Sequence, residues 1–349
     1  MNNHLSLWLL AGMATSSRTI AGILGKPRYY TSPNDTISHH ERDRLLAAPR
    51  GVAVDPNSRA VAINDTRAGR IAVVWPDGRW ETHPSQTKGN DLLLLDGYLL
   101  KAIDGGIEVM AVPSSLAGPI ATDASAPGHA LVALADDALA APPPGVSSEQ
   151  SVSVDDPLDD SVLAPPKSNM LFGLAHDPLT GTVFASHPDA AAVVAATAWR
   201  EPGASLARLR LDTSGLTAPD IHYPDGLVLS QTSDVLYLSC FHRVLALHLA
   251  SGNVSLVAGS TVAGHVDGLG PDARLDMPTS LAMDGDGALL VADRYNKVIR
   301  RIVLLAETGP GLVSTVAGTG SSGARGKPLA ADRTPSPMFT ASDGRGNLI

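Results

Sequence analysis

Pro278-Thr-Ser-Leu-Ala-Met-Asp-Gly-Asp-Gly-Ala-Leu-Leu-Val-Ala-Asp-Arg-Tyr-Asn-Lys-Val-Ile-Arg-Arg-Ile302 is the stretch that decides the fold. Its short apolar runs are separated by Asp, Asn and Gly, the residues that turns use. No helical 3.6-residue pattern lies between the runs, so the stretch predicts an antiparallel meander of four strands. The four predicted strands are 280–283, 288–292, 298–304 and, in the following Val-Ser-Thr-Val-Ala-Gly segment, 314–317.

The opening of this stretch recurs along the chain. The shared pattern is Pro, any residue, a small residue, alternating apolar residues and Asp, followed by a turn and a β-run. Successive copies lie about 55 residues apart, except that the first interval is about twice as long. The copies begin at Pro49, Leu171, Pro224, Pro278 and Pro337.

The long first interval contains one more copy. Three short apolar runs, at 91–95, 98–103 and 107–112, are joined by the turns Asp96-Gly97 and Gly105-Gly106. Two-residue glycine turns between such runs are typical of β-hairpins. The chain therefore contains six repeats.

Six repeats of four short strands predict an all-β fold: a six-bladed β-propeller of four-stranded antiparallel blades. Along the first strand of a repeat, small residues such as Gly51, Gly173 and Gly226 alternate with bulky ones. The small face of one blade can then receive the bulky face of the next. The predicted blades are about 49–85, 87–140, 171–215, 224–259, 278–318 and 337–349, the last of which is incomplete.

A fourth-strand sequence also precedes the first repeat. Residues 17–22, Ser-Arg-Thr-Ile-Ala-Gly, resemble residues 254–259 and 313–318, so we expect them to close the ring as the outer strand of the last blade. The propeller domain is thus 17–349, after an N-terminal segment at 1–16. The incomplete last blade has two explanations: the chain is a truncated piece of a longer protein, which we favour, or residues 5–10 fill part of the gap.

Residues 278–302, the Val-Ser-Thr-Val-Ala-Gly segment and the preceding 258–275 loop together closely resemble an NHL repeat. The likeness is strong over 252–349 and weak over 87–140. It implies a six-bladed propeller that binds proteins or, where the surface is basic, RNA. Asp293, Asn296 and Arg300 match positions of the family's repeat. We expect them to be structural, with Asp293 and Asn296 shaping a turn and Arg300 pairing with a nearby carboxylate.

Composition excludes several classes of function. The formal net charge is −9 and the basic residues form no stripe, which disfavours nucleic-acid binding. The apolar stretch at 5–12 is too short to span a membrane. Residues 12–14 resemble a signal cleavage site, but neither Lys nor Arg precedes them, so a soluble, intracellular protein is slightly favoured over a secreted one. Cys240, the single cysteine, lies in an apolar run and is expected to be buried and inert.

Residues 141–168 differ from the rest of the chain. They hold six prolines and five acidic residues, which cannot bury enough apolar surface to offset the entropy of ordering. We expect a disordered acidic loop between the second and third blades.

The residue after the first position of each repeat should lie at one mouth of the central channel. These residues are Arg50, Phe172, Asp225, Thr279 and Met338, of which the first four are the candidate partner-binding residues. The leading hypothesis is a non-catalytic scaffold that binds a protein or peptide partner through this mouth, or through top loops such as 265–274. We expect no cofactor, and a monomer or part of a larger chain.

The alternative is a metal-dependent propeller hydrolase or lyase, similar to lactonases or amidating lyases, that uses Asp225 and His176. One carboxylate is too few for a calcium site, and the histidine spacing gives no zinc pattern. The sequence therefore predicts neither a catalytic residue nor a metal site. The sequence leaves open whether the protein is an enzyme, and it favours a non-catalytic protein.

Overall fold

The computed structural model describes residues 7–11, 20–23, 49–55, 60–75, 80–85, 87–95, 97–112, 129–135, 169–216, 221–318 and 347–348. These residues form strands almost throughout, with a short 3-10 turn, η2, at Gly270–Asp272. The predicted loop at 141–168 and the repeat start at Pro337 lie outside the described residues. In the described part of the chain, no helix is long and apolar enough to cross a membrane.

Five meanders of four antiparallel strands account for most of the structure. The four strands predicted for the 278–317 copy are present, with ends that differ by three residues at most. The meanders are β3 (Pro49–Val54), β4 (Val61–Asp65), β5 (Arg70–Val74) and β6 (Trp80–Pro84); β7 (Gly89–Leu95), β8 (Tyr98–Ile103), β9 (Gly106–Ala111) and β10 (His129–Leu134); β11 (Leu174–His176), β12 (Val183–His187), β13 (Ala192–Ala196) and β14 (Ser205–Arg208); β15 (Pro224–Leu229), β16 (Val235–Cys240), β17 (Arg243–His248) and β18 (Val254–Gly259); and β20 (Pro278–Met283), β21 (Leu289–Asp293), β22 (Val298–Leu304) and β23 (Gly311–Ala317).

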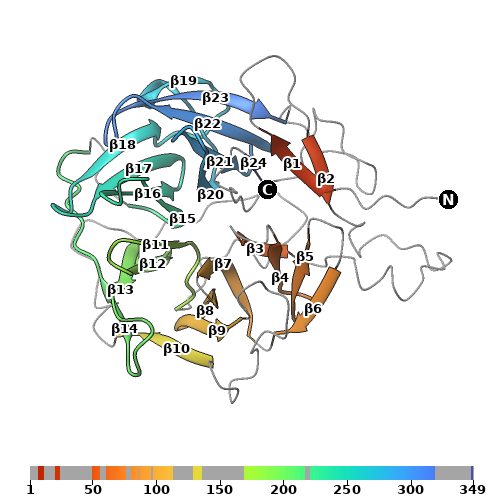
Figure 1. The fold of residues 1–349 in the computed structure, drawn as a ribbon. Coiled ribbons are helices and arrows are strands. Elements are labelled where there is room, and N and C mark those ends of the chain that lie inside the picture. The colour runs from red at the N-terminus through yellow and green to blue at the C-terminus, as the bar shows by residue number, and fades with distance from the viewer. Residues whose placement is uncertain are drawn as a thin grey trace, which may run out of the picture.

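The meanders are arranged around a common centre. Their first strands, β3, β7, β11, β15 and β20, lie toward the middle, and their fourth strands lie at the periphery (Figure 1). Consecutive first strands are neighbours in space: β3 lies beside β7, β7 beside β11, β11 beside β15, and β15 beside β20. This radial arrangement of meanders is a β-propeller. We call these five first strands the inner strands.

Two outer-edge features were not predicted. β10 pairs in parallel with β14, through Ala133 with Ser205 and Leu134 with Leu206, so that two meanders join into one eight-stranded sheet. A short strand, β19 (Gly268–Leu269), adds to the outer side of β23. Both pairings cover an edge that would otherwise expose backbone hydrogen-bonding groups.

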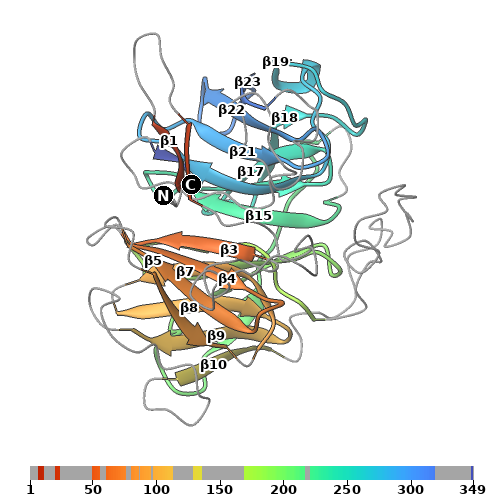
Figure 2. The ribbon, with the colours of Figure 1, turned by 90° about the vertical axis from the view of Figure 1, so that its right-hand side faces the viewer.

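The two ends of the chain share a further sheet (Figure 2). β1 (Leu7–Ala11) pairs antiparallel with both β2 (Ile20–Ile23) and β24 (Asn347–Leu348). β2 overlaps the segment predicted to close the ring and forms an outer strand of this sheet. β1 overlaps residues 5–10, which the second explanation of the incomplete blade assigned to the gap.

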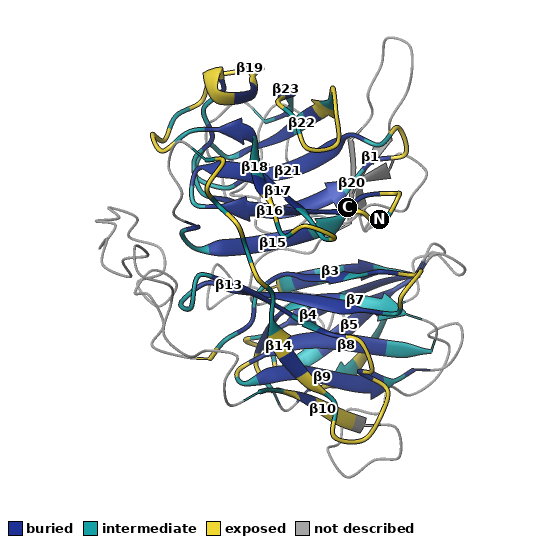
Figure 3. Cartoon of the chain, turned by 90° about the vertical axis from the view of Figure 1, so that its left-hand side faces the viewer, coloured by how far each residue is buried: buried dark blue, intermediate teal, exposed yellow. Residues whose placement is uncertain are grey.

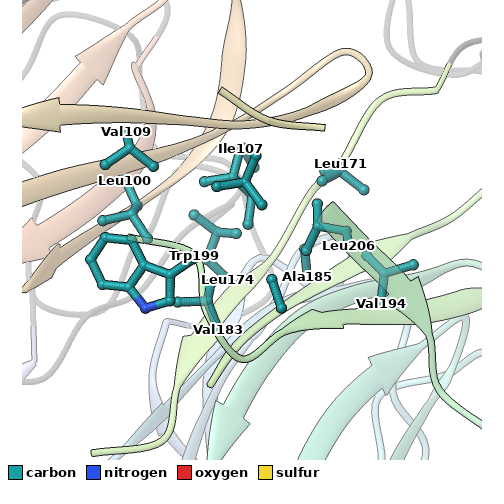
Figure 4. Packing of buried hydrophobic residues seen from close by; sticks show 13 residues of the cluster. Leu100, Ile107, Val109, Leu171, Leu174, Val183, Ala185, Val194, Trp199 and Leu206 are labelled. Carbon is teal, nitrogen blue, oxygen red and sulfur yellow. The ribbon is translucent and has the colours of Figure 1, made fainter. Parts of the chain in front are cut away.

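The hydrophobic core lies between the sheets rather than within any one of them. Each of the four larger clusters of buried side chains draws its members from two consecutive meanders. In one of them, Leu100, Ile107 and Val109 of β8 and β9 face Leu174 and Val183 of the next meander (Figure 4). Burial follows the strands, and exposed residues lie mainly in turns and outer segments (Figure 3). A single meander has a face to bury on each side, so the stacking holds the fold together.

Near the centre, the inner strands approach to backbone contact. A Cβ atom placed on Gly226 of β15 would lie 2.6 Å from the Cα of Ser280 on β20. Gly51 and Gly173 likewise face the backbone of the next inner strand. The small position of the repeat therefore has a direct steric reason, and it sets the distance between the strand starts that form the candidate site.

Replacing Gly226 with Ala tests this contact. Backbone atoms cannot move aside as a flexible side chain can, so we expect Gly226→Ala to lower the free energy of unfolding by about 2 kcal/mol or more. Gly215→Ala is the matched control, because its new Cβ would meet only a backbone oxygen at 3.8 Å. Urea unfolding of both variants measures the effect. Equal stability of the two variants would contradict the proposed close approach.

Candidate functional site

The inner strands begin with a common irregularity. In β3, β7, β15 and β20 the pairing with the second strand shifts register after the first one or two residues. Such a β-bulge re-aims the side chains next to it. The second strands also hold the backbone at the starts of β11 and β15: the N–H of Gly173 donates to Ser186 Oγ, and the N–H of Gly226 to Ser239 Oγ, each at 2.8 Å. The strand starts are thus fixed in position around the centre.

The four residues predicted at the channel mouth all lie at these starts. Asp225 and Thr279 are buried, and Arg50 and Phe172 are partly exposed. Arg50 interacts electrostatically with Asp225, although β3 and β15 are not neighbours. The structure therefore brings Arg50 and Asp225 together, whereas the side chains of Phe172 and Thr279 are not part of this charged group. We use the term channel mouth for the inner-strand starts and the charged side chains around them.

Sequence reasoning missed three polar residues of the mouth. Asn90 occupies the same repeat position as Asp225, and its Oδ1 accepts a hydrogen bond from Arg50 Nη1 at 2.9 Å. Asp91 follows it, at the position where the other four copies that the structure describes have Gly or Ser. Arg294, in the turn between β21 and β22, interacts electrostatically with Asp225, as does Asp91. The repeat pattern could have found Asn90 and Asp91, but their copy begins with Gly89 instead of Pro.

Asn90 and Asp91 hold β7 against β11 by side-chain hydrogen bonds. Asn90 Nδ2 donates to the carbonyl oxygen of Leu171 at 2.9 Å. Asp91 Oδ2 accepts from the N–H of Leu174 at 3.0 Å, and its Oδ1 from the N–H of Leu92 at 2.9 Å. Between β7 and β11, these side-chain hydrogen bonds take the place of the close backbone contact that joins the other neighbouring inner strands.

Below the mouth, the inner strands enclose a cavity of about 420 Å³. Asp91 and Thr279 line it near the strand starts, and His176 lines it near the other end of β11. The rest of the lining is mainly apolar, with partly exposed Val, Leu and Met side chains. These include Val52, Val54, Leu93, Leu229 and Met283.

Burial dominates the electrostatics of the mouth. Removal from water raises the pKa of Asp225 to about 8, and the neighbouring Asp91 raises it further against the opposing effect of Arg294 and Arg50. Burial also raises the pKa of Asp91 to about 7, opposed by the hydrogen bonds from Leu174 and Leu92. Two interacting carboxyls titrate as a pair. Near neutral pH, the mouth therefore holds at least one protonated carboxyl group.

Tyr223 and the turns around it border the mouth. Tyr223, directly before β15, has a left-handed backbone with φ of 53°, and Met277, directly before β20, has φ of 48°. Burial raises the pKa of Tyr223 to about 12, and the charges of Asp189 and Asp225 raise it further. Strained backbone of this kind persists where surrounding structure enforces it and is common at binding sites. The 265–274 loop lies elsewhere, because its β19 pairs with the outer strand β23.

The residues predicted to be structural form a buried network at the β21–β22 turn. Asp293 and Arg300 are both fully buried. Asp293 Oδ2 accepts from Arg300 Nη1 at 2.9 Å and from Asn296 Nδ2 at 2.8 Å. Arg300 Nη2 also donates to Asp267 Oδ1 at 2.8 Å and to the carbonyl oxygen of Val266 at 2.7 Å. Arg300 thus ties the 265–274 loop to the blade.

His176 and Asp225 do not converge. Gly173, three residues before His176, hydrogen-bonds through its N–H to the carbonyl oxygen of Asp225 at 3.1 Å. Three residues of a strand span about 10 Å, so His176 lies well below the mouth. Among the described residues, no group of three or more His, Cys, Asp or Glu side chains could hold a metal ion. These residues therefore do not form the site that the metal-dependent alternative requires. Cys240 is buried, and burial raises the pKa of its thiol to about 12, as expected of an inert cysteine.

Comparisons with known proteins support the fold. No family model matches the chain, and no curated protein sequence is significantly similar to it. A structural genomics protein of unknown function from Bacteroides thetaiotaomicron VPI-5482 superposes with a TM-score of 0.56 and 16% identity, over 87% of this chain and 67% of that one. An auxiliary nutrient binding protein from Bacteroides ovatus ATCC 8483 gives 0.56 and 15%, over 86% and 68%. A streptogramin B lyase gives 0.49 and 14%, over 84% and 73%. At these identities the first two show a shared fold and no more.

Removing Arg300 tests the buried network. Arg300→Met leaves the carboxylate of Asp293 buried without its main charged partner, so we expect a loss of about 3 kcal/mol in the free energy of unfolding. The neighbouring Arg301→Met is the control. Arg301 is 24% exposed and pairs with Asp284 and Asp286, the latter largely exposed, so its removal should cost less than about 1 kcal/mol. Similar losses of unfolding free energy in the two variants would contradict the expectation that the buried Arg300–Asp293 pair contributes more to stability than the exposed pairs of Arg301.

The raised pKa of Asp225 makes a signed prediction for stability. The folded-state pKa of about 8 lies above the unfolded value near 4, so the wild-type protein loses stability as the pH rises from about 4 to about 8. Asp225→Asn removes this loss. We expect the variant to be more stable than wild type by roughly 2–5 kcal/mol at pH 9, with a gain that shrinks toward zero near pH 4.

Unfolding measured from pH 4 to pH 9 checks the Asp225 prediction. The control is Asp272→Asn, an exposed carboxyl in η2, which should change stability by no more than about 0.5 kcal/mol at any pH. A gain for Asp225→Asn that does not depend on pH would contradict the raised pKa.

Proposed function

We propose that this chain is a six-bladed propeller of the NHL type that binds a protein or peptide partner at the channel mouth. The sheet of β2, β1 and β24 would be the sixth blade. In it, β1 lies between β2 and β24, which come from the two ends of the 17–349 domain. Support for the NHL assignment comes from the repeat pattern of 278–318 and from the position of Asp293, Asn296 and Arg300 in one buried network.

A single observation carries the binding proposal: the inner-strand starts converge on one group of charged side chains above an apolar cavity. Arg50, Asp91, Asp225 and Arg294 come from four different sheets, and the first, second and fourth of them each interact electrostatically with Asp225. Ligand sites are typically concave and largely apolar, with a few convergent polar groups. Perturbed carboxyl pKa values in such a place favour a functional site over a purely structural one.

A peptide display library tests this proposal. Peptides selected on the wild-type protein should lose at least tenfold in affinity for a variant that combines Arg50→Ser with Asp225→Asn. The control is Glu201→Gln, an exposed residue in the β13–β14 turn at the opposite end of the sheets. If mouth and control variants bind every selected peptide equally well, partners do not use the channel mouth.

Hydrolase or lyase chemistry is a second candidate, favoured by the two carboxyls with pKa values of about 7 and 8. One protonated and one ionised carboxyl suit general acid and base catalysis at neutral pH. The metal-dependent form of this hypothesis is tested by the metal content of purified protein and by thermal unfolding with added calcium or zinc. Stoichiometric metal with a raised Tm would favour an enzyme, whereas neither change would favour the binding protein.

A further inference from the structure

The carboxyl group of Asp225 accepts no hydrogen bond from the part of the chain that the structure describes. The residue is only 8% exposed, and among the described residues no side chain or N–H donates to its carboxyl oxygens, although its carbonyl oxygen accepts from Gly173 and Ser186. Buried carboxyls in folded proteins are ordinarily hydrogen-bonded. An acceptor group left open at a mouth is a place where a ligand can supply the donor.

The charged groups near Asp225 already interact with other residues. Asp91 accepts two backbone N–H groups, and Arg50 donates to Asn90. The guanidinium of Arg294 lies over the ring of Tyr295, 5.1 Å from its centroid. Arg50 and Arg294 therefore offset part of the charge of the carboxyl pair without donating a hydrogen bond to Asp225. Within the described ranges, no N–H or O–H group donates to the Asp225 carboxyl, and the donor best matched to a carboxylate carries a positive charge.

The lining of the cavity indicates which kind of substituent should be attached to such a donor. Gly226, Leu227 and the residues after them on β15 line the cavity, whereas Asp225 lies just above it. A ligand with its charged group on Asp225 therefore directs its next atoms either down, among apolar side chains, or out toward solvent. A cavity of about 420 Å³ is large enough to admit a large apolar side chain.

We infer that the channel mouth binds a primary ammonium group with an apolar substituent, the ammonium resting on the Asp225 carboxylate beside Asp91 and the substituent entering the cavity. This inference rests on the proposed function and specifies its ligand. A peptide N-terminus with a large apolar first residue fits best, because the amine stays at the mouth, the side chain points down and the rest of the peptide leaves outward. A lysine side chain entering from the mouth would place its ammonium below its own apolar stem, in the apolar part of the cavity.

The pH dependence follows from the groups around Asp225. These are Asp91 on β7, Arg50 on β3, Arg294 after β21 and Tyr223 before β15; the nearest residues of β20, Thr279 and Ser280, are uncharged. Ammonium binding requires the ionised carboxylate, so affinity for an alkylamine should rise about tenfold per pH unit up to pH 8 and then level off. A peptide α-amine itself deprotonates near pH 8, so its affinity should peak near that pH.

Calorimetric titration of the full chain with four probes tests the inference. Isoamylamine, a free amine, and leucinamide, a mimic of a peptide N-terminus, should bind with the two pH profiles described above. N-acetyl-leucinamide, which keeps the side chain but lacks the amine, and N-acetyl-lysinamide, which offers only a side-chain amine, should bind at least tenfold more weakly. Stronger binding of the lysine probe than of leucinamide would overturn the proposed orientation.

Variants complete the test. Asp225→Asn preserves shape and should lower leucinamide affinity at pH 8 at least tenfold, while Asp272→Asn should leave it unchanged. Equal binding by N-acetyl-leucinamide and leucinamide, or an unaffected Asp225→Asn variant, would overturn the inference. Failure of this inference is distinguishable from failure of the proposed function. If display-selected peptides depend on the mouth but bind equally well after N-terminal acetylation, the mouth is the binding site and the inferred contact with an amine is wrong.

Discussion

Backbone contact between consecutive inner strands is the constraint on which the rest of this structure depends. Gly51, Gly173 and Gly226 leave no room for a side chain, so each strand start is placed directly against the next. The bulges that follow then turn Arg50 and Asp225 toward a common space, and the apolar faces of the sheets meet at the right spacing to form the core. The fold and the candidate site thus follow from the same small residues.

Asp91 is the informative exception to this rule. It has a carboxyl group where the other four copies that the structure describes have Gly or Ser, and it holds β11 through the N–H of Leu174 rather than by close backbone approach. A buried carboxyl is unfavourable when ionised, which is why its pKa lies near neutrality. The nearby carboxyl of Asp225 raises the free energy further when both carboxyls are ionised, because the two negative charges repel each other. Polar groups that strain a core in this way usually serve binding or catalysis.

Local patterns made the fold predictable to a large extent. Alternation and Gly-rich turns located β7, β8 and β9 as well as the four strands of the 278–317 copy, because hydrophobic period and turn chemistry act within a few residues. The parallel pairing of β10 with β14 depends on contacts between two meanders and leaves no local signal. For the site, the repeat position gave Arg50 and Asp225. Asp91 was not recognised because its copy departs from the pattern twice, with Gly89 at the proline position and a carboxyl at the small position, and Arg294 was missed because it lies in a turn distant in sequence.

The titration of Asp225 and Asp91 tests the central claim most directly, because the claim is that the Asp225 carboxyl is buried beside Asp91 at the mouth and accepts no hydrogen bond from the described residues. Carbon-detected NMR of the side-chain carboxyls, assigned with the two Asn variants, measures it from pH 4 to pH 10. The account predicts a coupled pair with apparent pKa values of about 7 and about 8. Ordinary titration of both carboxyls below pH 5 would contradict it, since they would then be solvated or fully paired and the mouth would offer no open acceptor.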